Sequence, residues 1–424
     1  MSRPRITLNK AILVSVLLVV LTTGTIIKGV IPAFTRIQTD FPNYYTAGMI
    51  ARTGLGIERI YDDAWFQDQI FAHGMVQQGK FSPFPPPTAL LFAPLSLLEP
   101  LAALRVVTLI NLLLLLLSIW LISRLFEFSI PVSAAFALLS GVGLINCLQF
   151  GQLYIALSCS ILLSYFWIRN NRQIPAGVSA GLLAPIKYFS FLLLPAFVVR
   201  RQWRALVAGT LTVAFIFCCS VAFLGWDVHE QWVLSVLGAH LQSNLSLQNP
   251  FSSTFQSFDS LFRRLYLYDA RWNPNPFVDA PWLYVSFKII CITSIVTAAA
   301  GIVALLGRAK EPAAGLTLSI LCLGGLAIAP ATATYHFLLL WLPVGILLQF
   351  FRLRGKKGFF WSTGLLYSAI GFIPYSFFRG FDTGGLVTPL AYPRLFLLLL
   401  LFGLAITAAV LELGANAASQ SRVE

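Results

Sequence analysis

The stretch AILVSVLLVVLTTGTIIKGVI, from Ala11 to Ile31, decides the fold class of this chain. Its only charged residue is Lys28, and it matches the roughly 20 apolar residues that a helix needs to cross a bilayer core of about 30 Å. Basic residues precede it, but no small-residue cleavage site follows. The stretch therefore predicts an uncleaved first transmembrane helix rather than a signal peptide.

Similar apolar blocks recur along the rest of the chain. Of its 424 residues, 58% are hydrophobic and only 11% are charged, which is outside the range of soluble domains. Backbone groups in a bilayer must satisfy their own hydrogen bonds, so continuous apolar blocks indicate helices. The sequence predicts an all-α polytopic membrane protein with about 12 transmembrane helices.

The net charge of +13 has two interpretations, nucleic-acid binding or membrane topology. The basic residues favour topology, because they gather in short gaps between apolar blocks, as cytoplasmic loops do. With Arg3, Arg5 and Lys10, these clusters predict that both termini are cytoplasmic, in a cell (plasma or inner) membrane. The clusters are RNNR (169–172), RRQWR (200–204), GRAKE (307–311) and RLRGKK (352–357).

The alternation of spans predicts a single integral membrane domain over residues 1–412, with a short cytoplasmic tail at 413–424. Two large external loops are expected, at 32–100 and 225–281. In the first, Tyr61–Gly79 spaces its apolar residues along one side of a helix, which suits either a membrane-surface helix or one packed on other loops. Phe81–Pro100 is too short to span and is a candidate half-helix.

The apolar block Ile174–Val199 has basic loops at both ends, so it cannot be one span. Pro185 and Lys187 lie at its centre, where proline interrupts a helix. The block therefore predicts a hairpin of two short helices with its tip near the outer face. A lysine at that tip suits a phosphate group. The alternative is a lysine that snorkels from a distorted helix.

Asp40 follows the first span in TDFPNYY. A carboxylate near an apolar surface tends to have a raised pKa and can act as a general base. The alternative is an aspartate that caps the following helix. His336 opens a later apolar block, where a capping or packing role is the alternative to a functional one.

Other parts of the sequence give weaker signals. Gln152 lies at a predicted external helix start, after a glycine that permits close backbone approach. In the second loop, Asn249, Arg263 and Arg264 suit either a polar acceptor groove or a folded loop. The sequence has no Walker motif, GxGxxG, HExxH or paired-cysteine site, which argues against nucleotide hydrolysis and zinc chemistry.

Taken in order, six segments resemble glycosyltransferase family 87, polytopic enzymes of the GT-C superfamily that include bacterial α-mannosyltransferases. Each motif is short, and their specificity lies in the shared order. Tyr154, Ala329 and Tyr335 depart from the family pattern of Asn, Ser and a second His. The segments are DFPNYYTAG (40–48), FPPPTALLFAPLSLL (84–98), FGQLYIAL (150–157), AGVSAGLLAPIKYFSFLLLPAFVVRRQWRA (176–205), NPFSSTFQSFDSLFRRL (249–265) and APATATYHFLLLWLP (329–343).

The resemblance implies inverting transfer of a hexose, by family default mannose, from a polyprenyl-phosphate-sugar donor on the external face. Arabinose or another pentose stays open, and the acceptor is a glycolipid, a glycan or a protein. Asp40 would be the catalytic base, and Lys187 would stabilise the leaving phosphate. The other implied donor or substrate contacts are His336, Gln152, Tyr44, Tyr45 and Arg263.

The implied scheme requires no cofactor, although the carboxylates Asp62, Asp63 and Asp68 leave a divalent cation open. No nucleic acid is expected as a partner. Two other functional classes compete with the enzyme. A transporter or flippase would spread charges along helix centres and often shows an internal repeat. A non-catalytic subunit of an envelope-building complex would make Asp40 dispensable.

Overall fold

A computed structural model describes residues 8–242, 249–307, 311–382 and 384–420, and within these ranges the chain is helical without strands. Arg3, Arg5, Arg308 and Lys310, which belong to the predicted cytoplasmic clusters, lie outside the described residues, as does the end of the predicted tail from residue 421.

Among the described residues, six helices are long and apolar enough to cross a membrane, and a seventh candidate is a bent pair. These helices confirm a multi-pass membrane protein, whereas the predicted count of about 12 is not confirmed. The bent pair is α7 (Ile130–Leu138) with α8 (Val142–Gln149), which meet at 77°. The six spans are Ala11–Thr35, Pro100–Phe126, Trp203–Leu224, Pro281–Leu306, Thr334–Leu353 and Pro393–Ala417.

The remaining predicted spans are shorter or broken helices. Apolar content does not report where a helix ends or bends, so the hydropathy pattern counted as spans several blocks that the structure divides into helices shorter than 18 residues. The shorter elements are α9 (Tyr154–Arg169), α10 (Gln173–Leu182), η4 (Tyr188–Leu192), α11 (Leu193–Val199), α17 (Ala313–Ile328), α19 (Lys357–Phe372) and α20 (Tyr375–Arg379).

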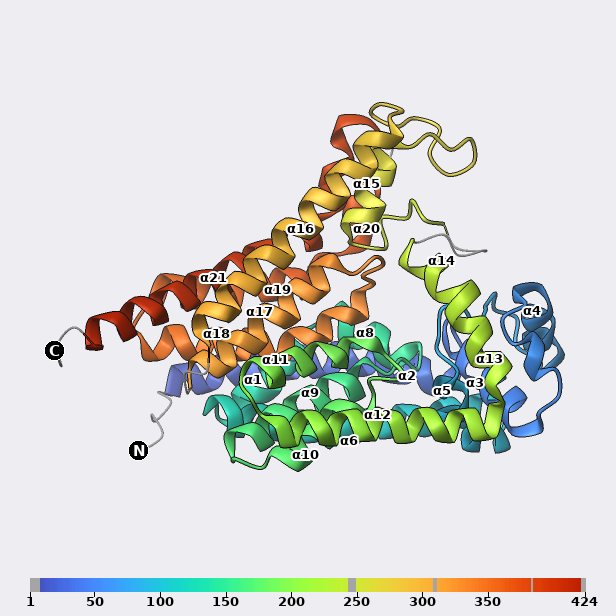
Figure 1. Cartoon of the computed structure of the whole chain (residues 1–424), viewed down its shortest axis with the longest axis horizontal. Coiled ribbons are helices and arrows are strands. Elements are labelled where there is room, and N and C mark those ends of the chain that lie inside the picture. The colour runs from blue at the N-terminus through green and yellow to red at the C-terminus, as the bar shows by residue number, and fades with distance from the viewer. Residues whose placement is uncertain (1–7, 243–248, 308–310, 383, 421–424) are drawn as a thin grey trace.

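The basic ends of several helices lie together. Arg352, near the end of α18 (Trp341–Leu353), donates to the carbonyl of Phe126 at 3.3 Å, where α6 (Pro100–Phe126) ends. Arg169 at the end of α9 donates to Leu125, and Arg354 pairs with Glu412 of α21 (Pro393–Gln420). The start of α1 (Leu8–Thr25) and the end of α21 lie at this same end of the molecule (Figure 1).

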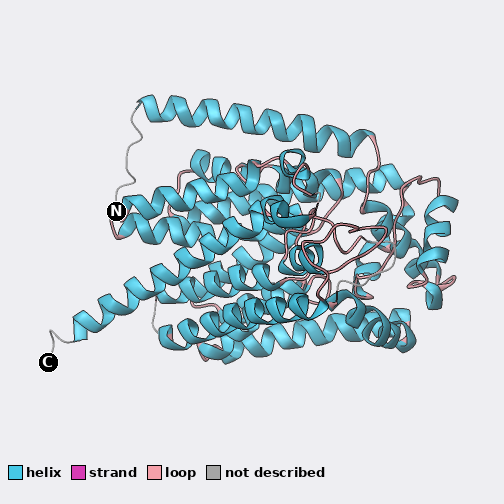
Figure 2. Cartoon of the chain, turned by 90° about the horizontal axis from the view of Figure 1, so that it is seen from above, coloured by secondary structure: helices cyan, strands magenta, loops and turns pink. Residues whose placement is uncertain are grey.

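The helices differ in how far they are enclosed. α18 is buried along most of its length, and its Trp341 is fully buried in the main hydrophobic core. By contrast, α1 lies along one edge of the molecule, beside the trace that leads from the N-terminus (Figure 2), and most of its apolar side chains are exposed. Such a surface on an apolar helix suits contact with lipid.

The block 174–199 is interrupted as predicted. α10 ends at Leu182, helical turns resume at Tyr188, and the residues between them, including Lys187, are not helical. α10 packs closely on α12 (Trp203–Leu224). A Cβ atom on Gly177 would lie 2.1 Å from the carbonyl oxygen of Ala205, so only glycine allows this approach. This contact holds the helix that leads into the break.

The two predicted loops are folded rather than extended. The first contains α3 (Phe41–Thr53), α4 (Asp63–Ala72) and α5 (Pro87–Phe92), and the second contains α13 (Trp226–Gln231), η5 (Trp232–Leu237), α14 (Gly238–Leu241) and α15 (Phe258–Tyr266). In α4, Phe66 and Ile70 are fully buried in a cluster with α3 and α5 residues, and Phe71 is exposed. The structure therefore favours a helix packed on protein over a membrane-surface helix.

Candidate functional site

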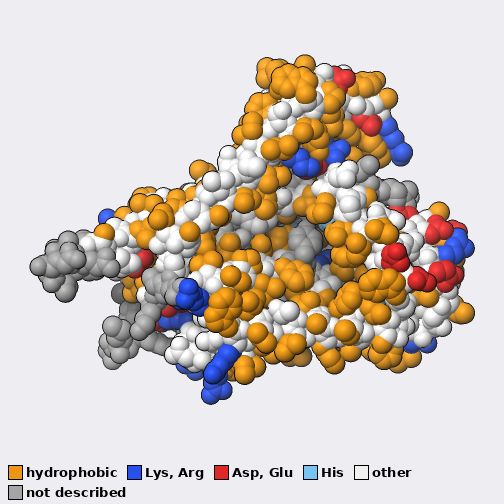
Figure 3. Space-filling model, in the orientation of Figure 1, with side chains coloured by type: hydrophobic (Ala, Val, Ile, Leu, Met, Phe, Trp, Pro, Cys, Tyr) orange, Lys and Arg blue, Asp and Glu red, His pale blue; other side chains and the backbone are white. Residues whose placement is uncertain are grey.

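A cavity of about 1030 Å³ lies where the two folded loops meet the helix bundle. Asp40, Lys187 and His336, which are far apart in the sequence, all line it. Other lining residues come from the proline-rich stretch 82–87 and from α12 to α14. On the face shown in Figure 3, the molecule is notched between the lobe with α15 and the lobe with α3 to α5.

Asp40 precedes α3 with a backbone φ of +72°, a left-handed conformation that is uncommon for a residue with a side chain. Its carboxylate makes no capping hydrogen bond to α3, so the capping interpretation is wrong. Instead, Oδ2 accepts a hydrogen bond from Gln152 Nε2 at 2.7 Å. The Thr39 hydroxyl donates to Oδ1 at 3.3 Å, and Tyr335 also hydrogen-bonds the carboxylate.

Gln152 is buried beneath Asp40 and is not among the residues that line the cavity. The Tyr44 hydroxyl donates to Gln152 Oε1 at 2.7 Å, and Asn111 donates to its backbone carbonyl at 3.1 Å. Because Oε1 accepts from Tyr44, the amide nitrogen must face Asp40. The structure thus places Gln152 and Tyr44 behind the carboxylate, and not where a substrate would touch them.

Burial raises the pKa of Asp40 above its ordinary value, because the charged form loses contact with water. The hydrogen bond from Gln152 and the positive charge of Lys187 oppose this shift without cancelling it. The carboxylate faces the cavity and is enclosed by protein on its other sides. This environment suits a group that accepts a proton.

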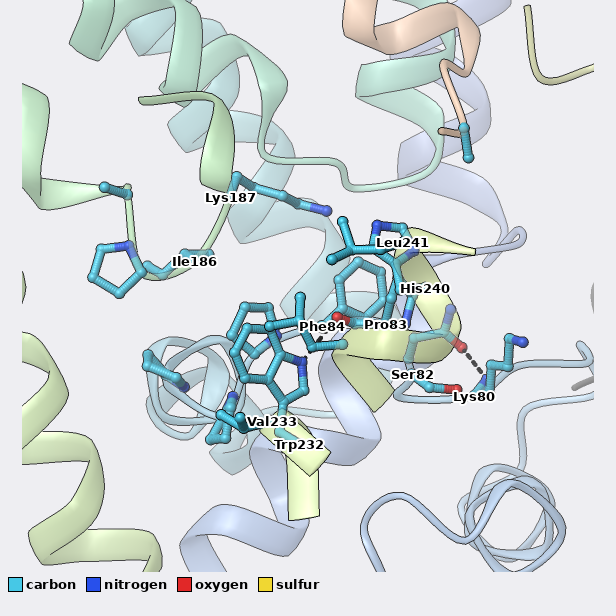
Figure 4. Close-up of a pocket in the computed structure, with 18 of the residues that line it drawn as sticks. Lys80, Ser82, Pro83, Phe84, Ile186, Lys187, Trp232, Val233, His240 and Leu241 are labelled. Carbon is cyan, nitrogen blue, oxygen red and sulfur yellow. Dashed lines mark hydrogen bonds between the residues drawn. The ribbon is translucent and has the colours of Figure 1, made fainter. Parts of the chain in front are cut away.

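Lys187 extends from the break after α10 into the cavity, on the side of Phe84 and Leu241 (Figure 4). Its ammonium lies 4.3 Å from the ring centre of Phe84, 5.3 Å from that of Tyr154 and 5.6 Å from that of Tyr44. It makes no hydrogen bond to another described residue. Burial lowers its pKa to about 7, against the opposing effect of Asp40. A buried lysine held by aromatic rings is not snorkelling to the surface.

His336 lines the cavity and also caps the start of its own helix, η6 (Thr334–Leu340). Its Nδ1 accepts from the Ala333 backbone N–H at 3.0 Å, and its Nε2 lies 2.7 Å from the Tyr154 hydroxyl. The rings of Tyr154 and Tyr335 contact His336 at centroid distances of 4.4 and 5.1 Å. Two of the three residues that depart from the pattern of the resembled family, Tyr154 and Tyr335, therefore contact this histidine.

Two further basic side chains of the cavity were not singled out in the sequence. Burial lowers the pKa of Lys80 to about 8. Burial, with the charges of Lys187 and Lys80, lowers that of His240 to about 4 (Figure 4). His240 sits in a stretch that looks like a polar loop, and Lys80 adjoins the proline-rich stretch. Only that adjacency could have drawn attention to Lys80.

One wall of the cavity is apolar in part. Val213 and Phe217 of α12, Trp232 and Val233 of η5, and Leu241 of α14 form it, and His229, Glu230 and His240 from α13 and α14 line the cavity beside them. Trp232 Nε1 donates to the carbonyl of Pro83 at 3.2 Å and ties this wall to the proline-rich stretch (Figure 4). Half of the residues of α12 are exposed at the protein surface, and only four of its 22 residues are buried. The cavity thus combines ionisable groups with apolar side chains, some of which belong to a lipid-compatible helix.

Besides Gln152 and Tyr44, two further predicted site residues do not line the cavity. Tyr45 is adjacent to Tyr44 in the sequence, but it is buried away from the cavity. Its hydroxyl donates to the carbonyl of Leu98 at 2.8 Å. Arg263 pairs with Asp259 at 2.8 Å and lines a separate, smaller cavity. Arg264 pairs with Asp382 and donates to the carbonyl of Phe251, which gives it a folding role within the second loop.

Within the described ranges, no group of three or more His, Cys, Asp or Glu side chains is placed to hold a metal ion. Of the carboxylates considered for a divalent cation, Asp62 caps α4 and pairs with Arg59. Asp63 accepts from the Ser82 hydroxyl at 2.9 Å.

Comparison with known proteins gives one match. Residues 83–330 match the model of glycosyltransferase family 87, which covers more than half of the chain. The matched range includes Gln152, Tyr154 and Lys187, while Asp40 and His336 lie outside it. No match was found among curated proteins or among solved structures.

Proposed function

The chain belongs to glycosyltransferase family 87, and from this membership we propose that it transfers a hexose, mannose by preference, from a polyprenyl-phosphate sugar to an acceptor hydroxyl. One observation carries the proposal. Asp40 and Lys187 line the same cavity, together with apolar side chains of α12, η5 and α14. A transporter or flippase is disfavoured by the family, whose members are glycosyltransferases.

In the proposed reaction, Asp40 takes the proton of the acceptor hydroxyl. At the same time, the acceptor oxygen forms a bond to the anomeric carbon of the sugar. The bond between that carbon and the phosphate oxygen breaks, and the lipid phosphate leaves with the electron pair. A single displacement of this kind inverts the anomeric configuration, and its transition state resembles an oxocarbenium ion. The raised pKa of Asp40 suits a base that works near neutral pH.

Lys187 is the proposed partner of the leaving phosphate. Its ammonium lies in the cavity without a hydrogen bond to any other described residue, so its donors are available to a ligand. An enclosed, pre-placed cation stabilises charge that develops on a leaving group more strongly than water does. The rings of Phe84, Tyr44 and Tyr154 hold it there.

Gln152 and Tyr44 are proposed as positioning residues, because they act on Asp40 rather than on substrate. The Tyr44 hydroxyl fixes the orientation of the Gln152 amide, and this amide donates to Asp40 at 2.7 Å. A carboxylate has about four lone-pair sites, and the contacts from Gln152, Thr39 and Tyr335 leave one for the acceptor hydroxyl. His336, with the hydroxyl of Tyr154, offers polar contacts to a donor or acceptor sugar.

The apolar wall supports a lipid donor over a nucleotide sugar. A polyprenyl chain could follow the exposed flank of α12, with its phosphate at Lys187. The basic helix ends lie away from the cavity, at the end where α1 begins and α21 stops (Figure 1). Because basic loops favour the cytoplasm, the cavity is proposed to face the external side of a plasma or inner membrane, with both termini inside.

The test is donor use by the purified protein in proteoliposomes. The expected result is transfer of labelled mannose from polyprenyl-phosphate mannose to a glycolipid, glycan or peptide acceptor. The product should have the anomeric configuration opposite to that of the donor. Equal or better transfer from GDP-mannose, or retention of configuration, would contradict the proposal.

A further inference from the structure

A charged cluster outside the main cavity joins α15 to α16 (Pro281–Leu306). At its centre, the Asp259 carboxylate is 2% exposed and pairs with Arg263 at 2.8 Å and with Lys288. The Tyr284 hydroxyl donates to the same carboxylate at 2.7 Å. Two cations share one anion, so the cluster carries a surplus positive charge.

The surplus charge faces a second cavity, of about 430 Å³. Both Arg263 and Lys288 line it, while Asp259 lies behind them and does not. No acidic side chain is among the described residues of its wall. The remaining lining residues are Gln242, Tyr284, Val285, Ile289, Ile292 and Thr293. The volume is within the range of cavities that hold small ligands.

This second cavity lies on a candidate membrane span. Val285 and Ile289 of α16 are 49% and 55% exposed, which marks this flank as a lipid-facing surface. Lys288 lies seven residues after the start of α16, or about 10 Å along it. Long cationic side chains at that depth reach the headgroup level.

We propose that this second cavity binds an anionic phospholipid, with its phosphate between Arg263 and Lys288 and its acyl chains along Val285 and Ile289. The site shares no lining residue with the main cavity. We choose an anionic over a zwitterionic phospholipid because of charge complementarity. A zwitterionic headgroup would not neutralise the surplus positive charge of the cluster.

The donor groups fit a phosphate. Arg263 uses Nε for Asp259, Nη2 for the carbonyl of Gln242 and one further donor for the Tyr284 hydroxyl, so two of its five N–H donors remain for a ligand. Lys288 uses its ammonium for Asp259 and, at 3.2 Å, for Tyr284, which leaves one donor direction. Charge-assisted bonds from both cations to phosphate oxygens would complete their coordination.

The experiment compares thermal unfolding of the purified full-length protein in detergent micelles with added phosphatidylglycerol or phosphatidylcholine. A ligand that binds the folded state raises Tm. We expect a larger Tm rise with phosphatidylglycerol, and we expect Arg263→Gln and Lys288→Gln each to lose at least half of the difference between the two lipids. Each substitution leaves Asp259 with one cationic partner, so the fold should survive.

Arg105→Gln is the matched control, because Arg105 is an exposed cation whose contact is the carbonyl of Phe34 at 2.9 Å. This variant should keep the full difference between the lipids. An equal loss in all three variants would overturn the proposal, as would equal effects of the two lipids on the native protein. If inorganic phosphate alone gives the same Tm rise, the ligand is free phosphate and the lipid assignment is wrong.

Discussion

At the scale of single residues, Asp40 combines a strained backbone with a carboxylate that a neighbouring side chain holds in place. Its left-handed backbone directs the side chain away from α3, and Gln152 holds one of its oxygens. Such strain persists only where neighbouring contacts stabilise it, and it gathers at functional sites. The support comes from Tyr44 through Gln152, so substitutions that never touch substrate should alter catalysis.

Gln152→Leu removes the amide donor to Asp40 while keeping the side chain's size. A hydrogen bond to a charged group contributes about 1.5–3 kcal/mol, so we expect kcat to fall about 10- to 100-fold with little change in the donor KM. The hydrogen bond favours the ionised carboxylate, and its loss should move the acidic limb of the kcat profile to higher pH. An unchanged acidic limb with normal kcat would contradict this role.

Lys187 should set the alkaline limb of the profile. Its pKa in the free protein is lowered to about 7 by burial, so the ammonium loses its proton as pH rises through that value. We expect kcat/KM for the donor to fall above about pH 7 for this reason. Lys187→Arg should retain activity at higher pH, because arginine stays protonated. An alkaline limb at the same pH in both proteins would exclude Lys187 as its source.

At the scale of elements, the sequence predicted well where local chemistry decides the structure. Pro185 interrupts the apolar block and Lys187 follows it, so the break between α10 and η4 could be anticipated. The bend between α7 and α8 could not, because hydropathy does not report helix direction. Nor does spacing reveal where a side chain points. Gln152 therefore looked like a substrate contact, and Arg263 could not be separated from the cavity.

The α10–α12 contact should be sensitive to the smallest added side chain. Gly177→Ala would place a Cβ 2.1 Å from the carbonyl of Ala205. Forcing atoms into a packed contact costs about 1–3 kcal/mol, so we expect a lower Tm and weaker donor use, since α10 leads to Lys187. Gly301→Ala is the control, because nothing lies within 4 Å of the added atom. Equal Tm values for both variants would contradict the packing argument.

At the scale of the whole molecule, the basic side chains and the cavity lie at different ends of the helix bundle. Basic side chains gather where α6, α9, α18 and α21 end, and the cavity lies where the folded loops meet. The sequence predicted this polarity through its basic clusters. It did not resolve how the loops fold, because α3 to α5 are buried by tertiary contacts with each other rather than by local pattern.

This polarity predicts which residues face outward. Single cysteines at Arg271, in the second loop, and at Arg201, in the basic end, should differ in reactivity towards a membrane-impermeant maleimide. Both positions are exposed. We expect Arg271→Cys to be labelled in intact cells and Arg201→Cys only after permeabilisation, with the six native cysteines as the background. The reverse pattern would place the cavity on the cytoplasmic side.

The role of Asp40 is tested most directly by sugar transfer from polyprenyl-phosphate mannose in proteoliposomes that contain Asp40→Asn. Asparagine keeps the shape and cannot accept the proton. Asp68→Asn, which removes an exposed carboxylate outside the cavity, is the matched control. The account predicts a loss of at least about 100-fold in kcat for Asp40→Asn, with unchanged Tm and full activity in the control. Transfer by Asp40→Asn at the native rate would contradict it.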